Sequence, residues 1–172
     1  MQAELSDLER KMIGWLRNEA DLWRNNTDRD LTGVRFASAL ELLLAYGRFH
    51  TPAPWSQGSP PGEERACYAE SLRYAQHAPE AVAYVEGRAF THGVPVEHAW
   101  CATPGGVVLD PTWDPPGDAY FGICFEAGAA VNLAASHDAA LLYYTGPDCP
   151  LATWLRGGIG EHLLAPVGRP LT

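Results

Sequence analysis

Basic residues are scarce in this chain of 172 residues. Lysine and arginine together number 12 against 21 aspartates and glutamates, so the formal net charge is -9 at pH 7. Lys11 is the sole lysine. A protein that binds nucleic acid without sequence preference needs a basic face that displaces counterions from the phosphates. The charge balance therefore argues against a nucleic-acid partner.

Long apolar runs are absent as well. No stretch reaches the roughly 18 apolar residues that a transmembrane helix needs, so no membrane partner is expected. The first seven residues are polar and acidic and lack the basic region and apolar run of a secretory signal. We expect a cytoplasmic protein, in which thiols stay reduced.

The cysteines lack the short spacing that binds zinc. The four are Cys67, Cys101, Cys124 and Cys149, and no two of them form a CxxC pair. We therefore expect no metal and no cofactor. Two disulfides remain possible, but free thiols become candidates for chemistry or for core packing.

Length and composition predict one ordinary globular domain. Hydrophobic residues make up 47% of the chain and charged residues 19%. We expect a single domain over residues 1–172, with a helical N-terminal part over 1–50 and a catalytic core over 62–145.

Hydrophobic periodicity predicts helices first and strands later. Apolar residues at three- and four-residue steps indicate helices over 4–24, 31–49 and 64–78, with Ser6 or Asp7 as the first cap. A Pro- and Gly-rich loop covers 51–62. Strands are expected over 81–90, 94–101, 107–111 and 120–125, and residues 130–144 form a helix or a helix plus a strand. Helices followed by an antiparallel sheet make an α+β fold.

One predicted hairpin brings a histidine to a carboxylate. A turn centred near residue 104 places His98 opposite Asp110, on the same face of two neighbouring strands. A carboxylate that accepts a ring proton of the imidazole fixes its tautomer and stabilises the imidazolium. The pair is therefore an oriented base, although structural pairing alone remains an alternative.

Cys67 is the best candidate for the nucleophile that such a base would serve. It falls in the first turn of the third predicted helix, where the positive end of the helix dipole favours a thiolate. A neighbouring imidazolium would favour the thiolate further. The alternative is a small buried helix residue.

Four segments together resemble the transglutaminase-like superfamily of cysteine enzymes. They are Cys67 at a helix start, Tyr84-Val85-Glu86-Gly87, His98-Ala99-Trp100, and Val108-Leu109-Asp110-Pro111-Thr112. The similarity covers roughly residues 65 to 125 and implies a papain-like core. It also implies that Cys67 is the nucleophile, His98 the general base and acid, and Asp110 the residue that orients His98.

The resemblance implies acyl transfer through a thioester intermediate, on a peptide, a protein, or a small amide or thioester substrate. Attack by water would make the protein a protease or amidase, and attack by an amine would make it a transamidase. Three alternatives stay open: an inactive binding module with the same fold, an acyltransferase that uses a thioester donor, and a metal-dependent hydrolase.

Other residues are weaker candidates for the cleft. The backbone N–H of Cys67 is a natural oxyanion donor, and a second donor could come from Gln57 or from the Trp55 indole. Glu86 lines the cleft or is a charged strand residue. Trp100 is a packing residue rather than a platform for substrate.

The remaining histidines are expected at the surface, and Cys101 is expected to face away from His98 and into the core. The histidines expected at the surface are His50, His77, His92, His137 and His162.

Overall fold

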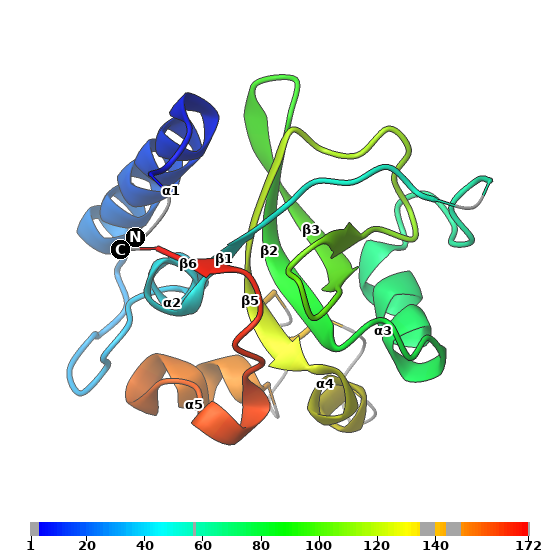
Figure 1. Ribbon diagram of the computed structural model, residues 1–172. Helices are drawn as coiled ribbons and strands as arrows, with labels where there is room; N and C mark the ends of the chain where they lie inside the picture. Colours follow the sequence, from blue (N-terminus) through cyan, green and yellow to red (C-terminus); the bar gives the residue numbers. More distant parts are fainter. Residues whose placement is uncertain (1–3, 57, 135–139, 144–148, 172) are drawn as a thin grey trace.

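The computed structural model describes residues 4–56, 58–134, 140–143 and 149–171. Its centre is a curled six-stranded antiparallel sheet with the strand order β4-β3-β2-β5-β1-β6 (Figure 1). Five α-helices surround it in this described part of the chain, so the α+β class is confirmed. No helix among these residues is long and apolar enough to cross a membrane.

The elements alternate more than the sequence pattern indicates. The helices are α1 (Asp7–Asn26), α2 (Ala39–Tyr46), α3 (Cys67–His77), α4 (Ala127–Ala134) and α5 (Pro150–Gly157), with a 3₁₀ turn η1 (Glu161–Leu163). The strands are β1 (Arg48–His50), β2 (Ala83–Thr91), β3 (Val94–Ala102), β4 (Val108–Leu109), β5 (Ala119–Glu126) and β6 (Arg169–Pro170). Helices α1, α2 and α5 lie beside β1 and β6, whereas α3 and α4 lie at the other end of the sheet (Figure 1).

The first helix follows the sequence pattern closely. Ser6 caps α1 by accepting a hydrogen bond from the backbone N–H of Glu9, whose carboxylate accepts one from the backbone N–H of Ser6. The buried positions of α1 recur at three- and four-residue steps and are Met12, Ile13, Leu16 and Ala20. Ser6 is thus the cap, and it is one of the two residues predicted for this position.

The second helix is much shorter than predicted over 31–49. Gly33 adopts a left-handed φ of 73°, and Ser38 caps α2 through the backbone N–H of Glu41. The helix ends at Gly47. A Cβ at this position would lie 2.5 Å from the Phe121 ring. The chain then joins the sheet as β1, which pairs with β5. The Ser38 cap and the pairing of β1 with β5 therefore set the two ends of α2, in place of the apolar pattern.

The two faces of the sheet have different covers. One face packs against all five helices through a large core that includes Leu16, Leu43, Leu72, Ile123 and Trp154. The other face is smaller, with Val85, Trp100 and Tyr120 at its centre, and Trp113 and Val167 pack against it. His98 and Trp100 are two residues apart on β3 and so point to this second face.

Candidate active site

His98 lies on β3 where this strand has no partner on its outer side. β4 pairs only with Cys101 and Ala102, so the part of β3 at His98 borders β2 alone. Helix α3 packs against β3, with the Ser71 hydroxyl donating to the carbonyl oxygen of Ala99. The open edge therefore lets a residue at the start of α3 approach the His98 ring.

The predicted contact between His98 and Asp110 is confirmed. Nε2 of His98 lies 2.6 Å from Oδ2 of Asp110, and both side chains are buried. The predicted register is wrong by two residues, because Leu109 rather than Val107 lies opposite Cys101. A shift of two residues keeps every side chain on its face, so the contact survives.

Asp110 is held by donors on both carboxylate oxygens. Oδ2 accepts from His98 and from the Tyr120 hydroxyl at 3.1 Å. Oδ1 accepts from the backbone N–H and the hydroxyl of Thr112, and from the backbone N–H of Trp113. A carboxylate that accepts this many hydrogen bonds is fixed in position.

The surroundings of His98 favour its protonated form. Burial alone lowers the pKa of His98, but hydrogen bonds to Asp110 and to Cys67 and the charges of both raise it to about 9. Because Asp110 occupies Nε2, Nδ1 is the ring nitrogen that remains for the Cys67 thiol. Cys67 is thus a neighbour that acts on the pKa of His98, in addition to the carboxylate that is bound at Nε2.

Cys67 is the first residue of α3 and is partly exposed, unlike the three other cysteines, which are buried. Arg65 precedes it with a left-handed φ of 68°, which explains why α3 starts later than the predicted residue 64. The N-cap residue Ala66 makes no side-chain hydrogen bond, in contrast to the serine caps of α1 and α2. The first N–H groups of α3 thus lack a side-chain cap beside the thiol.

Of the two loop candidates for an oxyanion donor, the structure describes Trp55. Gln57 lies outside the described residues. The Trp55 ring packs edge-on against Tyr74, with centroids 5.3 Å apart, and lines a pocket with Glu80 and Leu109. Tyr74 lies two helical turns beyond Cys67, so the structure places Trp55 away from the thiol.

Glu86 and Trp100 are both fully buried. The Glu86 carboxylate accepts hydrogen bonds from the backbone N–H groups of Leu141 and Leu142 and from the Tyr84 hydroxyl. Burial raises the pKa of Glu86 to about 7 despite these three donors. Trp100 packs against the Tyr120 ring, with centroids 5.0 Å apart, which fits its expected packing role.

Two residues that the sequence interpretation left out contact the candidate pair. The Trp113 indole stacks on the His98 ring, with centroids 4.0 Å apart and planes 20° from parallel. Tyr120 donates to Asp110 and also accepts from the backbone N–H of Gly117. Trp113 follows Asp110 by three residues, so the Asp-Pro-Thr-Trp sequence was an available signal. Nothing local in the sequence links Tyr120 to Asp110.

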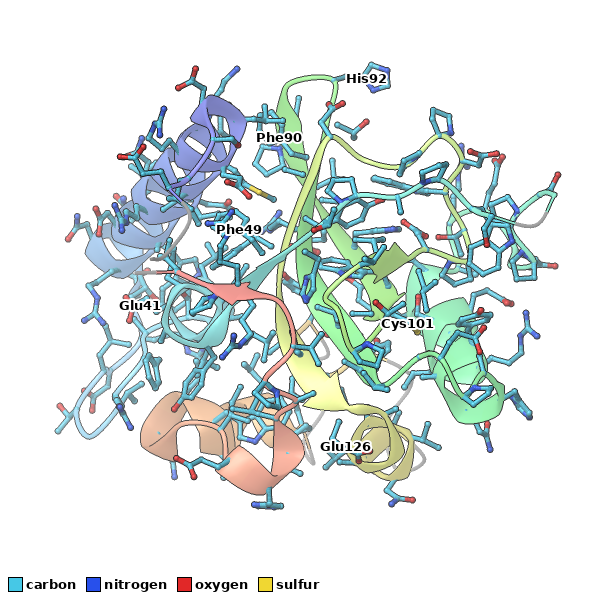
Figure 2. All side chains as sticks on the ribbon, in the orientation of Figure 1. Glu41, Phe49, Phe90, His92, Cys101 and Glu126 are labelled. Carbon is cyan, nitrogen blue, oxygen red and sulfur yellow. The ribbon has the colours of Figure 1, made fainter. Side chains whose placement is uncertain are left out.

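The outlying histidines and cysteines are mostly where expected. His77, His92 and His162 are exposed, and His92 projects from the tip of the β2–β3 hairpin (Figure 2). His137 lies outside the described residues. Cys101 is buried and its thiol donates to the carbonyl oxygen of Ser71 on α3.

His50 corrects the surface expectation. It is buried on β1, with Nε2 3.1 Å from the Cys124 sulfur, because β1 joins the sheet instead of extending a helix. Burial, with a smaller effect of the Arg48 charge, lowers the pKa of His50 to about 3.

The four cysteines form no disulfide with one another. Among the described residues, no three or more histidine, cysteine, aspartate or glutamate side chains are grouped so that they could hold a metal ion. The chain matches no protein-family model, no curated protein and no solved structure. The function must therefore be argued from the site itself.

Proposed function

We propose that this protein is a cysteine-dependent acyl-transfer enzyme with a transglutaminase-like, papain-like core. In this proposal Cys67 is the nucleophile, His98 the general base and acid, and Asp110 the residue that orients His98. The observation that supports it most is the buried hydrogen bond between His98 and Asp110, together with the influence of Cys67 on the pKa of His98. Nucleophile, base and orienting group are the three parts that such catalysis needs.

The first half-reaction uses the two nitrogens of His98 differently. Before the substrate reacts, Nδ1 holds the proton that the Cys67 thiol has given up, and the thiolate sulfur attacks the carbonyl carbon of an amide or thioester, forming a C–S bond. His98 then gives the proton to the leaving amine or thiol as the bond to the acyl carbon breaks. Asp110 stabilises the imidazolium between these two transfers, and its contacts with Thr112 and Tyr120 keep it in place.

The start of α3 supplies the electrostatic part of the proposal. The negative charge that develops on the carbonyl oxygen needs hydrogen-bond donors fixed in advance. The backbone N–H of Cys67 belongs to the first turn of a helix without a side-chain cap. The positive end of the helix dipole favours both the thiolate and the oxyanion.

The second half-reaction releases the acyl group from Cys67. Water attacks the thioester in a protease or amidase, and an amine attacks it in a transamidase. In either case His98 accepts the proton of the attacking group and the sulfur leaves as a thiolate.

Alkylation of Cys67 by iodoacetamide across a pH series tests the proposal. The thiolate displaces iodide, and mass spectrometry assigns the modified cysteine. Cys101, Cys124 and Cys149 are buried and serve as internal references. We expect fast reaction of Cys67 well below pH 8, and a rate at pH 6.5 at least about tenfold lower in His98→Ala and His98→Gln. Circular dichroism checks that each variant is folded.

Slow alkylation of Cys67 at every pH, with or without His98, would contradict the proposal and favour an inactive binding module. Incubation with thioester and amide substrates then separates the donor classes, since mass spectrometry detects the acylated Cys67. Acylation by thioesters alone would identify an acyltransferase rather than an amidase.

A further inference from the structure

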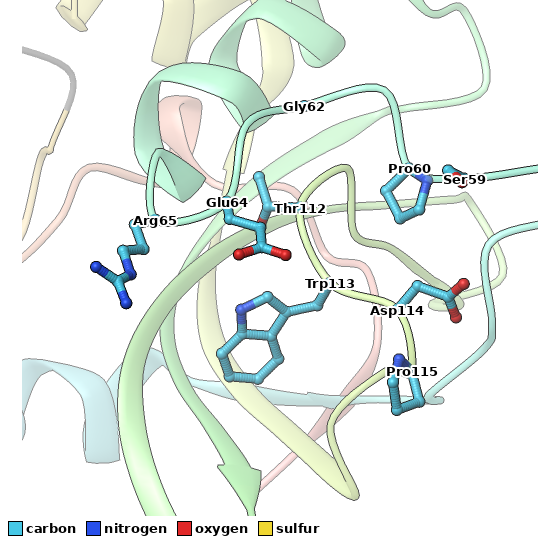
Figure 3. Close-up of a pocket in the computed structure, with 9 residues that line it drawn as sticks. All are labelled: Ser59, Pro60, Gly62, Glu64, Arg65, Thr112, Trp113, Asp114 and Pro115. Carbon is cyan, nitrogen blue, oxygen red and sulfur yellow. The ribbon is translucent and has the colours of Figure 1, made fainter.

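A pocket of about 590 Å³ opens beside the candidate active site. Its walls are the segment 59–65, which leads into α3, and the segment 112–115, which follows Asp110 (Figure 3). The backbone N–H of Gly62 donates to the carbonyl oxygen of Pro111 at 2.8 Å and ties the two walls together. A Cβ on Gly62 would lie 2.8 Å from that oxygen, so the close approach requires glycine.

The wall made by 112–115 is part of the same hydrogen-bonded unit as the candidate catalytic pair. Thr112 and Trp113 both donate their backbone N–H groups to Asp110. One face of the Trp113 indole lies on the His98 ring, and Trp113 also lines the pocket. An aromatic ring fixed in this way presents the pocket with a preformed π surface next to the reacting groups.

Charged groups surround this indole unequally. Glu64 and Asp114 lie on different sides of Trp113, and Glu64 extends toward the indole whereas Arg65 extends away from it (Figure 3). Within the described part of the chain, neither carboxylate forms an ion pair. An indole face with carboxylates around it is an arrangement that attracts an organic cation.

We infer that this pocket binds a cationic group of the substrate, an ammonium or a guanidinium, against Trp113 and Glu64 while the acyl group is at Cys67. The inference rests on the proposed function, because it concerns the substrate of that site. An anionic group would meet two carboxylates and one guanidinium in the lining, while the charge of His98 behind the indole is paired with Asp110. The net charge of -9 for the chain acts in the same direction, since it draws cations toward the protein.

Three methanethiosulfonate reagents that differ in charge test the pocket without knowledge of the substrate. They carry a methyl group, a trimethylammonium-ethyl group or a sulfonatoethyl group. In each case the Cys67 thiolate attacks the sulfenyl sulfur, a mixed disulfide forms and methanesulfinate leaves. Each rate is divided by the rate of the same reagent with 2-mercaptoethanol, which removes the intrinsic reactivity.

We expect the normalised rate at Cys67 to be about three- to tenfold higher for the cationic reagent than for the neutral one. Glu64→Gln and Trp113→Leu should each lower this ratio about twofold or more. Glu63→Gln is the matched control, because it removes the same charge from the same exposed segment but Glu63 does not line the pocket. Its ratio should stay that of the unmodified protein.

Equal normalised rates for the three reagents would overturn the inference and leave the proposed function intact. A ratio that falls as much in Glu63→Gln as in Glu64→Gln would also overturn it, because the preference would then come from overall charge. Fastest reaction with the sulfonate would assign the pocket to an anionic group through Arg65. Failure of Cys67 to react with any reagent would remove the proposed function and the inference together.

Discussion

Nε2 of His98 and Oδ2 of Asp110 lie 2.6 Å apart in a site where both side chains are buried. This contact determines which nitrogen of the His98 ring remains available for a proton transfer. With Nε2 bound to the carboxylate, Nδ1 is the ring nitrogen that remains, and the ring cannot rotate without losing the hydrogen bond to Asp110. The orientation of this single ring therefore underlies the proposed chemistry.

Asp110→Asn should lower the pKa of His98. In the unmodified protein burial lowers this pKa, but the hydrogen bonds and charges of Asp110 and Cys67 together raise it to about 9. An asparagine keeps the shape but removes the charge, so burial should bring the pKa to its ordinary value of 6.5 or below. Nuclear magnetic resonance of the histidine ring against pH measures it directly.

Tyr120→Phe is the matched control for that experiment. It removes one hydrogen bond from the same Asp110 oxygen but leaves the carboxylate charged. The pKa of His98 should stay well above 6.5, while the free energy of unfolding falls by about 1 to 3 kcal/mol because the Gly117 N–H loses its acceptor. A His98 pKa that is equal in Asp110→Asn and in the unmodified protein would contradict the role given to Asp110.

The sequence predicts the His98–Asp110 contact because alternation along a strand has a period of two. The turn between β3 and β4 runs from Thr103 to Val107, with Gly106 at a left-handed φ of 75°, so its centre lies one residue beyond the predicted position. The error shifts the register by two residues and leaves both side chains on one face. The face on which each side chain lies was thus easier to predict than the residue that lies opposite it.

Periodic patterns in the sequence could not predict the short strands or the contacts between distant segments. β1 has three residues and β6 two, which is too few to show a period, and β1 lay inside a predicted helix. The contact of Tyr120 with Asp110 and that of Trp55 with Tyr74 depend on how distant segments pack. Local patterns carry no information about such contacts.

Gly87→Ala should destabilise the protein strongly. Gly87 lies between His98 on β3 and Gly122 on β5 in the sheet. An added Cβ would lie 2.2 Å from the Phe121 carbonyl oxygen and 2.4 Å from the Gly122 Cα, and both are backbone atoms that cannot turn aside. We expect a loss of about 3 kcal/mol or more in the free energy of unfolding, measured with urea.

Gly14→Ala is a control for which we expect the opposite effect on the free energy of unfolding. Gly14 is an exposed position inside α1, and nothing lies within 4 Å of an added Cβ. Alanine should stabilise the protein by about 0.5 to 1 kcal/mol, because it restricts the unfolded chain and favours the helix. Equal effects of the two substitutions would show that the close contact at Gly87 is absent in solution.

Glu86 should make the protein less stable as the pH rises through 7. Its folded-state pKa of about 7 lies above its ordinary value of 4.5, because burial disfavours the charged form. The stabilising contribution of the protonated form is therefore complete below pH 4.5 and is lost as the pH rises through 7. The loss is at most about 3 kcal/mol. Unfolding of the unmodified protein and of Glu86→Gln in urea, at steps from pH 4.5 to 8, measures it as the difference between the two.

Glu86→Gln isolates this effect, since glutamine does not titrate. The difference in unfolding free energy between the unmodified protein and the variant should shrink steadily across that pH range. The variant should also be less stable at low pH by about 1 to 3 kcal/mol, because its amide group places a donor against a backbone N–H of Leu141 or Leu142. A difference that does not vary with pH would refute the assignment.

His50 should have the reverse effect, with stability lost as the pH falls. Its folded-state pKa of about 3 lies below its ordinary value of 6.5, chiefly because burial beside Cys124 disfavours the imidazolium. The contribution is complete above pH 6.5 and declines as the pH falls toward 3, by up to about 1.4 kcal/mol per pH unit. Between pH 4.5 and 6.5 this slope opposes that of Glu86, so the unmodified protein should show a nearly flat profile there. His50→Gln removes one of the two opposing slopes, and its stability should therefore rise as the pH falls through that interval. An unmodified protein whose stability rises as steeply as that of the variant would mean that His50 is not buried in its neutral form.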